Sequence, residues 1–220
     1  DFNSGAASFN EDISAWDTSG VTNMRGMFRS ASSFNQTLGS WQVDKVTSMA
    51  NMFQDAGVFN QDIGDWDVTS VTAMYSMFQK ALAFNQDLGD WQIGSVKSIS
   101  FMFREAEAFN QDLGDWAVRL GNVNQMTYTF NGATAFNQAL GWCVDDAVLF
   151  ATTDVNSGTF SDAFLNAPCA SSSCGVVQES PSCTITDAMT DSTIGNAVLD
   201  WFADPTAAKS TYGHISTWDT

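Results

Sequence analysis

Apolar side chains recur along the first two thirds of the chain with a period of 25 residues. Each repeat opens on a Phe-Asn pair, followed by Ile or Leu four residues after the Phe and by Trp six or seven residues after it. A β-branched residue, then Met or Ile, then a second Phe complete the unit. The Phe-Asn pairs begin at Phe9, Phe34, Phe59, Phe84, Phe109 and Phe136. One coil of this length cannot bury its own apolar face, so the pattern predicts coils that stack around a continuous core.

The segment Val-Thr-x-Met-x-x-Met-Phe, as in residues 71–78, is rich in β-branched and aromatic residues and predicts a short strand in each coil. Stacked strands would pair in parallel about 4.8 Å apart. The Asn after each opening Phe predicts a buried ladder of side-chain amides that bond the backbone of adjoining coils. The expected fold class is therefore a repeat solenoid with a parallel β-sheet of short strands and irregular returns.

The pattern Phe-Asn-Gln-Asp-Ile-Gly-Asp-Trp-Asp-Val…Val-Thr-x-Met-x-x-Met-Phe, complete between Phe59 and Phe78, resembles the BspA-type leucine-rich-repeat surface proteins. The resemblance covers about residues 2–142. It implies a leucine-rich-repeat-like solenoid with a surface, adhesive or structural role and no catalytic residues. The last full coil departs from the pattern, because residues 119–122 add two positions and Thr129 replaces a Met.

Four domains are expected: an array of coils at 1–142, a degenerate coil and disulfide cap at 143–184, a helical connector at 185–213 and the start of a following coil array at 214–220. A solenoid end exposes an unpaired edge over an open core and needs such a cap. The connector could pack over the cap or over the start of a following coil. The final residues 215–220 match residues 13–18 at five of six positions, which predicts a longer repeat of about 200 residues that continues beyond both ends.

All the cysteines lie in the predicted cap, and an even, local cluster predicts two disulfides and an oxidising compartment. A four-thiolate zinc site would normally show Cys-x-x-Cys pairs, which are missing here. The sequence does not choose among the three pairings of the four residues, which are Cys143, Cys169, Cys174 and Cys183.

The chain carries 25 acidic and 8 basic residues, for a formal net charge of −17. This balance argues against nucleic acid or anionic lipid as a partner, because both require clustered basic residues. One row of aspartates stands three residues after the opening Phe of four coils, at Asp12, Asp62, Asp87 and Asp112. Stacked carboxylates in this row could hold calcium, the one candidate cofactor, or each could cap its own turn through a backbone N–H.

Side chains in the middle of the expected strand vary from coil to coil, whereas the core positions do not. Tyr75, Phe101 and Tyr128 could form an aromatic partner-binding strip there, although Phe101 could also turn inward. The Trp positions are expected in the core rather than on a sugar-binding platform. Asn35 begins a glycosylation sequon, Asn35-Gln36-Thr37, but its place in the predicted buried ladder argues against modification.

No catalytic constellation emerges, since the single histidine, His214, has no Ser or Cys partner placed by a motif. The chain also has no run of about 18 apolar residues that could span a membrane. We therefore expect a non-enzymatic, extracellular or cell-surface repeat protein. The first hypothesis is a fibre or surface layer built by self-association or by adjoining modules of the same chain. The alternative is an adhesin-like module that binds a protein or glycan through its strand face.

Overall fold

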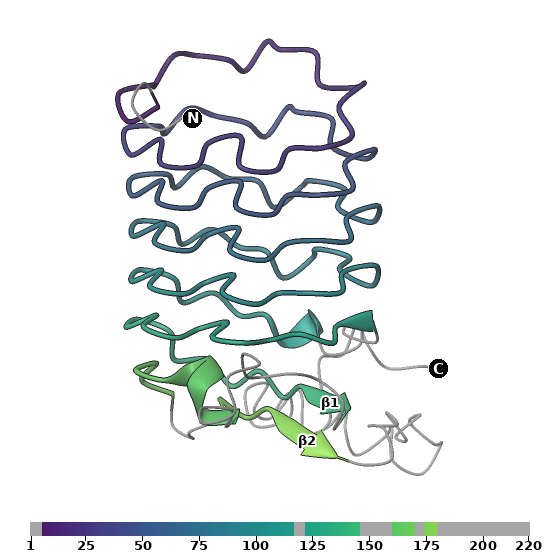
Figure 1. Cartoon of the computed structure of the whole chain (residues 1–220), viewed down its shortest axis with the longest axis vertical. Helices are drawn as coiled ribbons and strands as arrows, with labels where there is room; N and C mark the ends of the chain where they lie inside the picture. Colours follow the sequence, from purple (N-terminus) through teal and green to yellow (C-terminus); the bar gives the residue numbers. More distant parts are fainter. Residues whose placement is uncertain (1–5, 117–121, 146–159, 170–173, 180–220) are drawn as a thin grey trace, which may run out of the picture.

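The computed structural model describes residues 6–116, 122–145, 160–169 and 174–179. Successive repeats lie one upon another as stacked coils (Figure 1). One isolated parallel bridge joins each pair of neighbouring coils at equivalent positions, which are Asn23–Ser48, Ser48–Ala73, Ala73–Ser98 and Ser98–Gln125. The period of the sequence is therefore the period of the contacts between coils.

The segments predicted as strands form pairs of tight turns instead. In the first coil the Met27 N–H donates to the Met24 carbonyl (3.2 Å) and the Ala31 N–H donates to the Phe28 carbonyl (3.1 Å). The third residue of each turn has a positive φ, 64° at Gly26 and 61° at Ser30, as a type II turn requires. Two left-handed residues per coil interrupt the extended backbone, which limits parallel pairing to single bridges. We call the repeated segments the turn row: residues 24–31, 49–56, 74–81, 99–106 and 126–133.

Backbone hydrogen bonds still join the turn row from coil to coil. Alternate N–H groups of one coil donate to carbonyls of the next: Met24 to Ser48 (2.9 Å), Gly26 to Ala50 (2.9 Å), Phe28 to Met52 (2.8 Å) and Ser30 to Gln54 (2.7 Å). Equivalent sets follow from the second coil to the third, from the third to the fourth and from the fourth to the fifth. Most of the remaining N–H groups close the turns, so the backbone of this row is paired both within and between coils.

Side-chain ladders join the other side of the coils. The Asn60 N–H donates to Asn35 Oδ1 (2.9 Å), and Trp66 Nε1 donates to the Leu38 carbonyl (3.1 Å). The predicted asparagine ladder is thus present, but its members are half-buried or exposed rather than buried. Both ladders repeat at each coil, with donors at Asn35, Asn60, Asn85, Asn110 and Asn137 and at Trp41, Trp66, Trp91, Trp116 and Trp142.

Two columns of phenylalanine rings fill the core. Within a coil the rings of Phe53 and Phe59 stack with centroids 3.9 Å apart, and each also stacks on its equivalent in the next coil, Phe78 at 5.7 Å and Phe84 at 5.9 Å. All four side chains are fully buried. Stacked aromatic pairs add stability beyond the area they bury. In the first coil Phe28 is buried and Met27 is exposed, whereas Met52 and Phe53 are both buried in the second.

The structure also describes part of the segment predicted as the cap. A 3₁₀ helix, η2 (Phe160–Phe164), extends one ring column, because Phe164 stacks on Phe130 at 5.5 Å. Strand β1 (Cys143–Asp145) pairs in parallel with β2 (Val177–Glu179). The predicted connector at 185–213 and the predicted following array at 214–220 lie outside the described residues.

Candidate interaction surfaces

The outward side of the turn row carries a cluster of aromatic rings and guanidinium groups. The rings of Phe101 and Tyr128 lie 5.5 Å apart, and Arg104 Cζ lies 5.9 Å from each centroid. Arg25 Cζ lies 5.6 Å from the Tyr75 ring. We call these five residues the basic–aromatic face. The three aromatic side chains are half-buried, so Phe101 does not join the core.

Two members of this face occupy a backbone conformation that bulky residues avoid. The φ angle is 59° at Phe101 and 53° at Tyr128, where earlier coils have Gly26 and Asn51. The left-handed conformation costs an L-residue roughly 1–2 kcal/mol, and glycine or asparagine tolerates it best. Coil stacking holds the two aromatic residues in place against this cost. Local preference did not predict this left-handed conformation, because aromatic residues there favour a strand.

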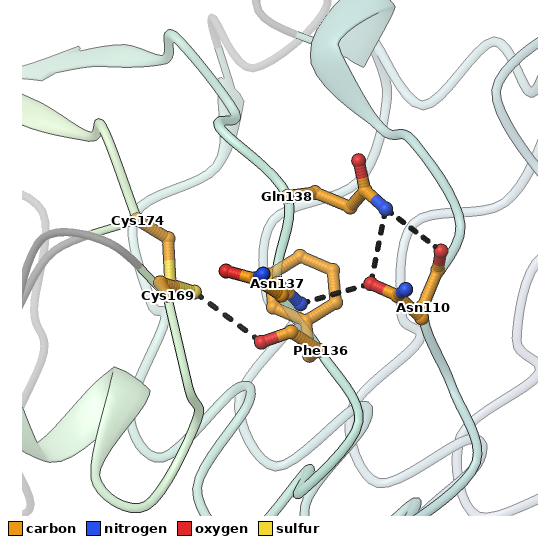
Figure 2. The surroundings of a disulfide bond; sticks show 6 residues. All are labelled: Asn110, Phe136, Asn137, Gln138, Cys169 and Cys174. Atoms are coloured by element: carbon orange, nitrogen blue, oxygen red, sulfur yellow. Dashed lines mark hydrogen bonds between the residues drawn. A yellow bond between two sulfur atoms is a disulfide. The ribbon is translucent and has the colours of Figure 1, made fainter.

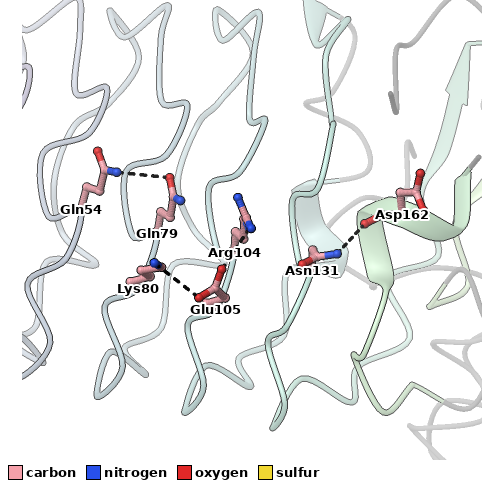
Figure 3. A network of polar contacts seen from close by, with 7 residues as sticks. All are labelled: Gln54, Gln79, Lys80, Arg104, Glu105, Asn131 and Asp162. Carbon is pink, nitrogen blue, oxygen red and sulfur yellow. Dashed lines mark hydrogen bonds and ion pairs between the residues drawn. The ribbon is translucent and has the colours of Figure 1, made fainter. Parts of the chain in front are cut away.

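A polar ladder runs beside the basic–aromatic face (Figure 3). Gln54 Nε2 donates to Gln79 Oε1 at 3.4 Å, between successive coils. Glu105 pairs with two cations, with Lys80 Nζ at 3.7 Å and Arg104 Nε at 3.2 Å. These side chains remain more than a third exposed, so each ion pair contributes little to stability. The Arg104–Glu105 ion pair lies beside the rings.

Aspartates gather on the segments that carry the Asn and Trp ladders, which we call the acidic flank: residues 10–17, 35–42, 60–67, 85–92 and 110–116. The aspartates that were predicted to bind calcium each cap a turn of their own coil. The N–H of Gly64 donates to Asp62 Oδ1 at 3.0 Å, the shared geometry of the row. The equivalent carboxylates are Asp12, Asp87 and Asp112, which accept from Ser14, Gly89 and Gly114 at 2.8–2.9 Å.

Hydrogen bonds also lower the pKa of three flank aspartates. At Asp67 the Thr69 hydroxyl donates at 2.6 Å and the Thr69 N–H at 3.1 Å, and these bonds lower the pKa below the ordinary value of an aspartate. The Ser19 hydroxyl and then its N–H lower the pKa of Asp17 in the same way. At Asp12 the main cause is the Ser14 N–H. Local bonds thus keep these groups ionised to a lower pH than an ordinary aspartate.

A cavity of about 200 Å³ opens on the acidic flank, lined by Asp87, Gly89, Asp90, Gln111, Asp112 and Asp115. Within the part of the chain that the structure describes, no group of three or more His, Cys, Asp or Glu side chains is arranged to hold a metal ion. Calcium binding at Asp12, Asp62, Asp87 and Asp112 stays a prediction.

A disulfide closes a short loop beside the last described coil (Figure 2). Cys169 and Cys174 are joined, with their Cα atoms 5.1 Å apart. Cys169 Sγ lies 3.5 Å from the Phe136 carbonyl oxygen, a close contact rather than a hydrogen bond because an oxidised sulfur carries no proton. Cys183 lies outside the described residues. If the predicted second disulfide forms, it must join Cys183 to Cys143.

Asn35 is exposed, so burial does not explain the expectation that it carries no glycan. Its Oδ1 accepts hydrogen bonds from the Asn60 N–H (2.9 Å) and from Gln61 Nε2 (3.0 Å), which orient the side chain along the stack. The amide is thus held by the ladder, and the absence of a glycan stays a prediction.

The basic–aromatic face and the acidic flank lie on opposite sides of the core. Phe53 projects inward from the turn row and Trp66 from the acidic flank, and their rings meet with centroids 6.5 Å apart. The same contact recurs in the next coil between Phe78 and Trp91 at 6.4 Å. Because the inward side chains of the two segments meet, their outward side chains point away from each other.

The stacked 25-residue coils and their ladders define a repeat protein whose contacts run between neighbouring repeats. The chain belongs to the family described as "Mycoplasma protein of unknown function, DUF285", whose model matches residues 2–69 and 38–142. No curated protein and no solved structure matches the chain. The family match is consistent with a surface repeat protein. In the described part of the chain, no helix has the length and apolar character needed to cross a membrane.

Proposed function

We propose that this protein is an extracellular structural or surface repeat protein whose coil modules build a fibre or surface layer. In this proposal the stack is a leucine-rich-repeat-like solenoid of the BspA type, and its partners are further copies or adjoining modules of the same chain. The protein has no enzymatic role in the proposal, and calcium is the only cofactor it admits. The Cys169–Cys174 disulfide supports an oxidising, extracellular location.

The observation that carries this proposal is the identity of the contacts at successive coil junctions. At each junction an Asn side chain accepts from the next Asn N–H at 2.8–2.9 Å, and a Trp indole reaches back to a carbonyl. The acidic-flank aspartates cap turns of their own coils. These polar side chains thus bond within the stack and are not left free to bind a ligand. Such use is expected of a repeat protein whose role is to extend or to present a surface.

The alternative is an adhesin-like module that binds a protein or glycan ligand. Its support is the basic–aromatic face, where Phe101 and Tyr128 are kept half-exposed at a cost in backbone strain. Strained residues concentrate at functional sites. Aromatic residues and arginine are also the types enriched in the cores of protein interfaces.

Negative-stain electron microscopy of the native protein tests the proposal. Long regular filaments or ordered layers are expected if the modules build a structure. Dispersed single rods, unchanged when the protein is concentrated, would contradict it and favour the adhesin. Binding to immobilised glycans and matrix proteins, compared with a Tyr75→Ala/Phe101→Asn variant, would then identify the ligand class.

A further inference from the structure

The charges of this protein are separated between the two sides of the stack. Of the six Lys and Arg residues in the described part of the chain, four lie on the turn row, which has only Asp55 and Glu105 as acids. The acidic flank has no Lys or Arg among its described residues and holds ten acids. The four turn-row cations are Arg25, Arg29, Lys80 and Arg104, and the ten acids are Glu11, Asp12, Asp17, Asp62, Asp65, Asp67, Asp87, Asp90, Asp112 and Asp115.

We propose that the basic–aromatic face docks onto the acidic flank of a second copy of this chain, so that stacks associate side by side. The inference rests on the proposed self-associating function and names the surfaces that carry it. A surface with rings and guanidinium groups at its centre matches a carboxylate-rich partner in both chemistry and charge.

Spacing favours a second copy over other acidic partners. Carboxylates of the acidic flank recur at one position per coil, as Asp62, Asp87 and Asp112 do, and coils rise by about 4.8 Å. Arg25 and Arg104 project from coils of the same rise, three repeats apart. The acidic row of another copy, laid alongside, presents a carboxylate at the level of each of these coils.

The overall negative charge does not prevent this contact. At physiological ionic strength the Debye length is about 8 Å, so repulsion between distant parts of two copies is largely screened. Close pairs across the contact are screened much less, and the rings of Tyr75, Phe101 and Tyr128 add apolar area. Because the two surfaces differ, each copy keeps one of them free after pairing. Such a heterologous contact extends without closing.

Neutralising each surface separately tests the proposal by sedimentation velocity. One variant, Arg25→Gln/Arg104→Gln, loses the cations of the basic–aromatic face. A second, Asp65→Asn/Asp90→Asn, loses two exposed carboxylates of the acidic flank that are separate from the row that caps Gly64 and its equivalents. The matched control, Lys45→Gln/Lys97→Gln, removes two exposed cations outside the turn row. Circular dichroism and melting temperature verify that each variant folds.

Wild type and control are expected to associate, less so in high salt, while each double variant associates about tenfold more weakly or stays monomeric. An equimolar mixture of the two double variants retains one intact contact and should form 1:1 pairs that do not grow. Double variants that associate like wild type would overturn the side-by-side contact yet leave fibre formation standing. A wild type that stays monomeric, or one that binds only soluble polyanions, would overturn the contact as well, and microscopy of native material then decides the proposed function separately.

Discussion

Two positions of the same coil behave in opposite ways. On the acidic flank, the residue after the opening Phe is Asn in each coil, and its Oδ1 accepts the N–H of the next Asn at 2.8–2.9 Å. On the turn row, the first left-handed position keeps its φ between 53° and 64° but holds Gly26, Asn51, Ser76, Phe101 and Tyr128. A side chain that joins two coils must stay the same. Where the backbone alone makes the joint, the side chain is free to serve another purpose.

The largest difference in stability between inward and outward positions is expected when a core ring is removed. We expect Phe78→Ala to destabilise the stack by about 3–5 kcal/mol, because the ring is fully buried and stacks on three neighbouring phenylalanines. Tyr75→Ala, three residues earlier on the outward side, should change the free energy of unfolding far less. Chemical denaturation of the two variants measures the difference. Equal losses would mean that the outward ring is part of the core.

A smaller effect is expected within the ladder. Asn85 Oδ1 accepts from the Asn110 N–H (2.9 Å) and from Gln111 Nε2 (3.0 Å). Asn85→Ala leaves the half-buried Asn110 N–H without this acceptor, which should cost about 1–3 kcal/mol. Asn51→Gly on the turn row is the contrasting variant, because the Asn51 side chain bonds within its own coil, through Nδ2 to Gln54, and glycine accepts the left-handed φ of 59°. If Asn85→Ala unfolds at the wild-type denaturant midpoint, the ladder does not stabilise the stack.

Relieving the backbone strain at Phe101 is expected to change the free energy of unfolding in the opposite direction, toward greater stability. Phe101→Asn places at this left-handed position the residue type that Asn51 provides two coils earlier, and we expect a gain of up to about 1 kcal/mol. Association or ligand binding should fall in the same variant, since the ring is lost. Thermal melting and a binding assay measured together test the two halves of this expectation. A clear loss of stability would show that the ring serves the fold.

Acid should weaken the stack through the hydrogen-bonded carboxylates of the acidic flank. The pKa of Asp67 is below 3.8 in the folded chain, so its contribution to stability is complete above that value and is lost as pH falls through the folded pKa. Asp67→Asn keeps an oxygen acceptor for Thr69 but does not titrate. Denaturant midpoints recorded between about pH 5 and pH 2 should therefore fall less steeply for Asp67→Asn than for wild type. Asp44→Asn, on a segment outside the flank, is the control, and an identical slope in all three proteins would contradict the expectation.

The smallest expected effect concerns calcium. Because Asp12, Asp62, Asp87 and Asp112 already accept backbone N–H groups, we expect the same melting temperature with a chelator and with millimolar calcium. A rise of several degrees with calcium, lost on Asp87→Asn/Asp112→Asn substitution, would instead support the calcium hypothesis.

Much of this architecture could be predicted from the repeat alone. The 25-residue period identified the stacking unit, the Phe and Trp positions identified the core, and the Asn position identified the ladder. The turns could not be predicted, because the left-handed positions of the turn row hold Lys80, Phe101, Glu105 and Tyr128 as well as turn-favouring Gly, Asn, Asp and Ser residues. Phe101 and Tyr128 favour a strand by local preference, and contacts between coils override that preference. The separation of charge was also missed, since it depends on which segments meet across the core.

The hydrogen bonds of one coil junction all keep a fixed sense. In the turn row, backbone N–H groups such as that of Phe28 donate toward the following coil, whereas the Asn and Trp donors reach back to the preceding one. The two surfaces that a coil presents to its neighbours therefore carry different sets of donors and acceptors. Two stacks can join end to end only head to tail, because a reversed contact would set donor against donor. Any array lengthened in this way has a polarity like that of a cytoskeletal filament, with two ends that differ in how they accept the next unit.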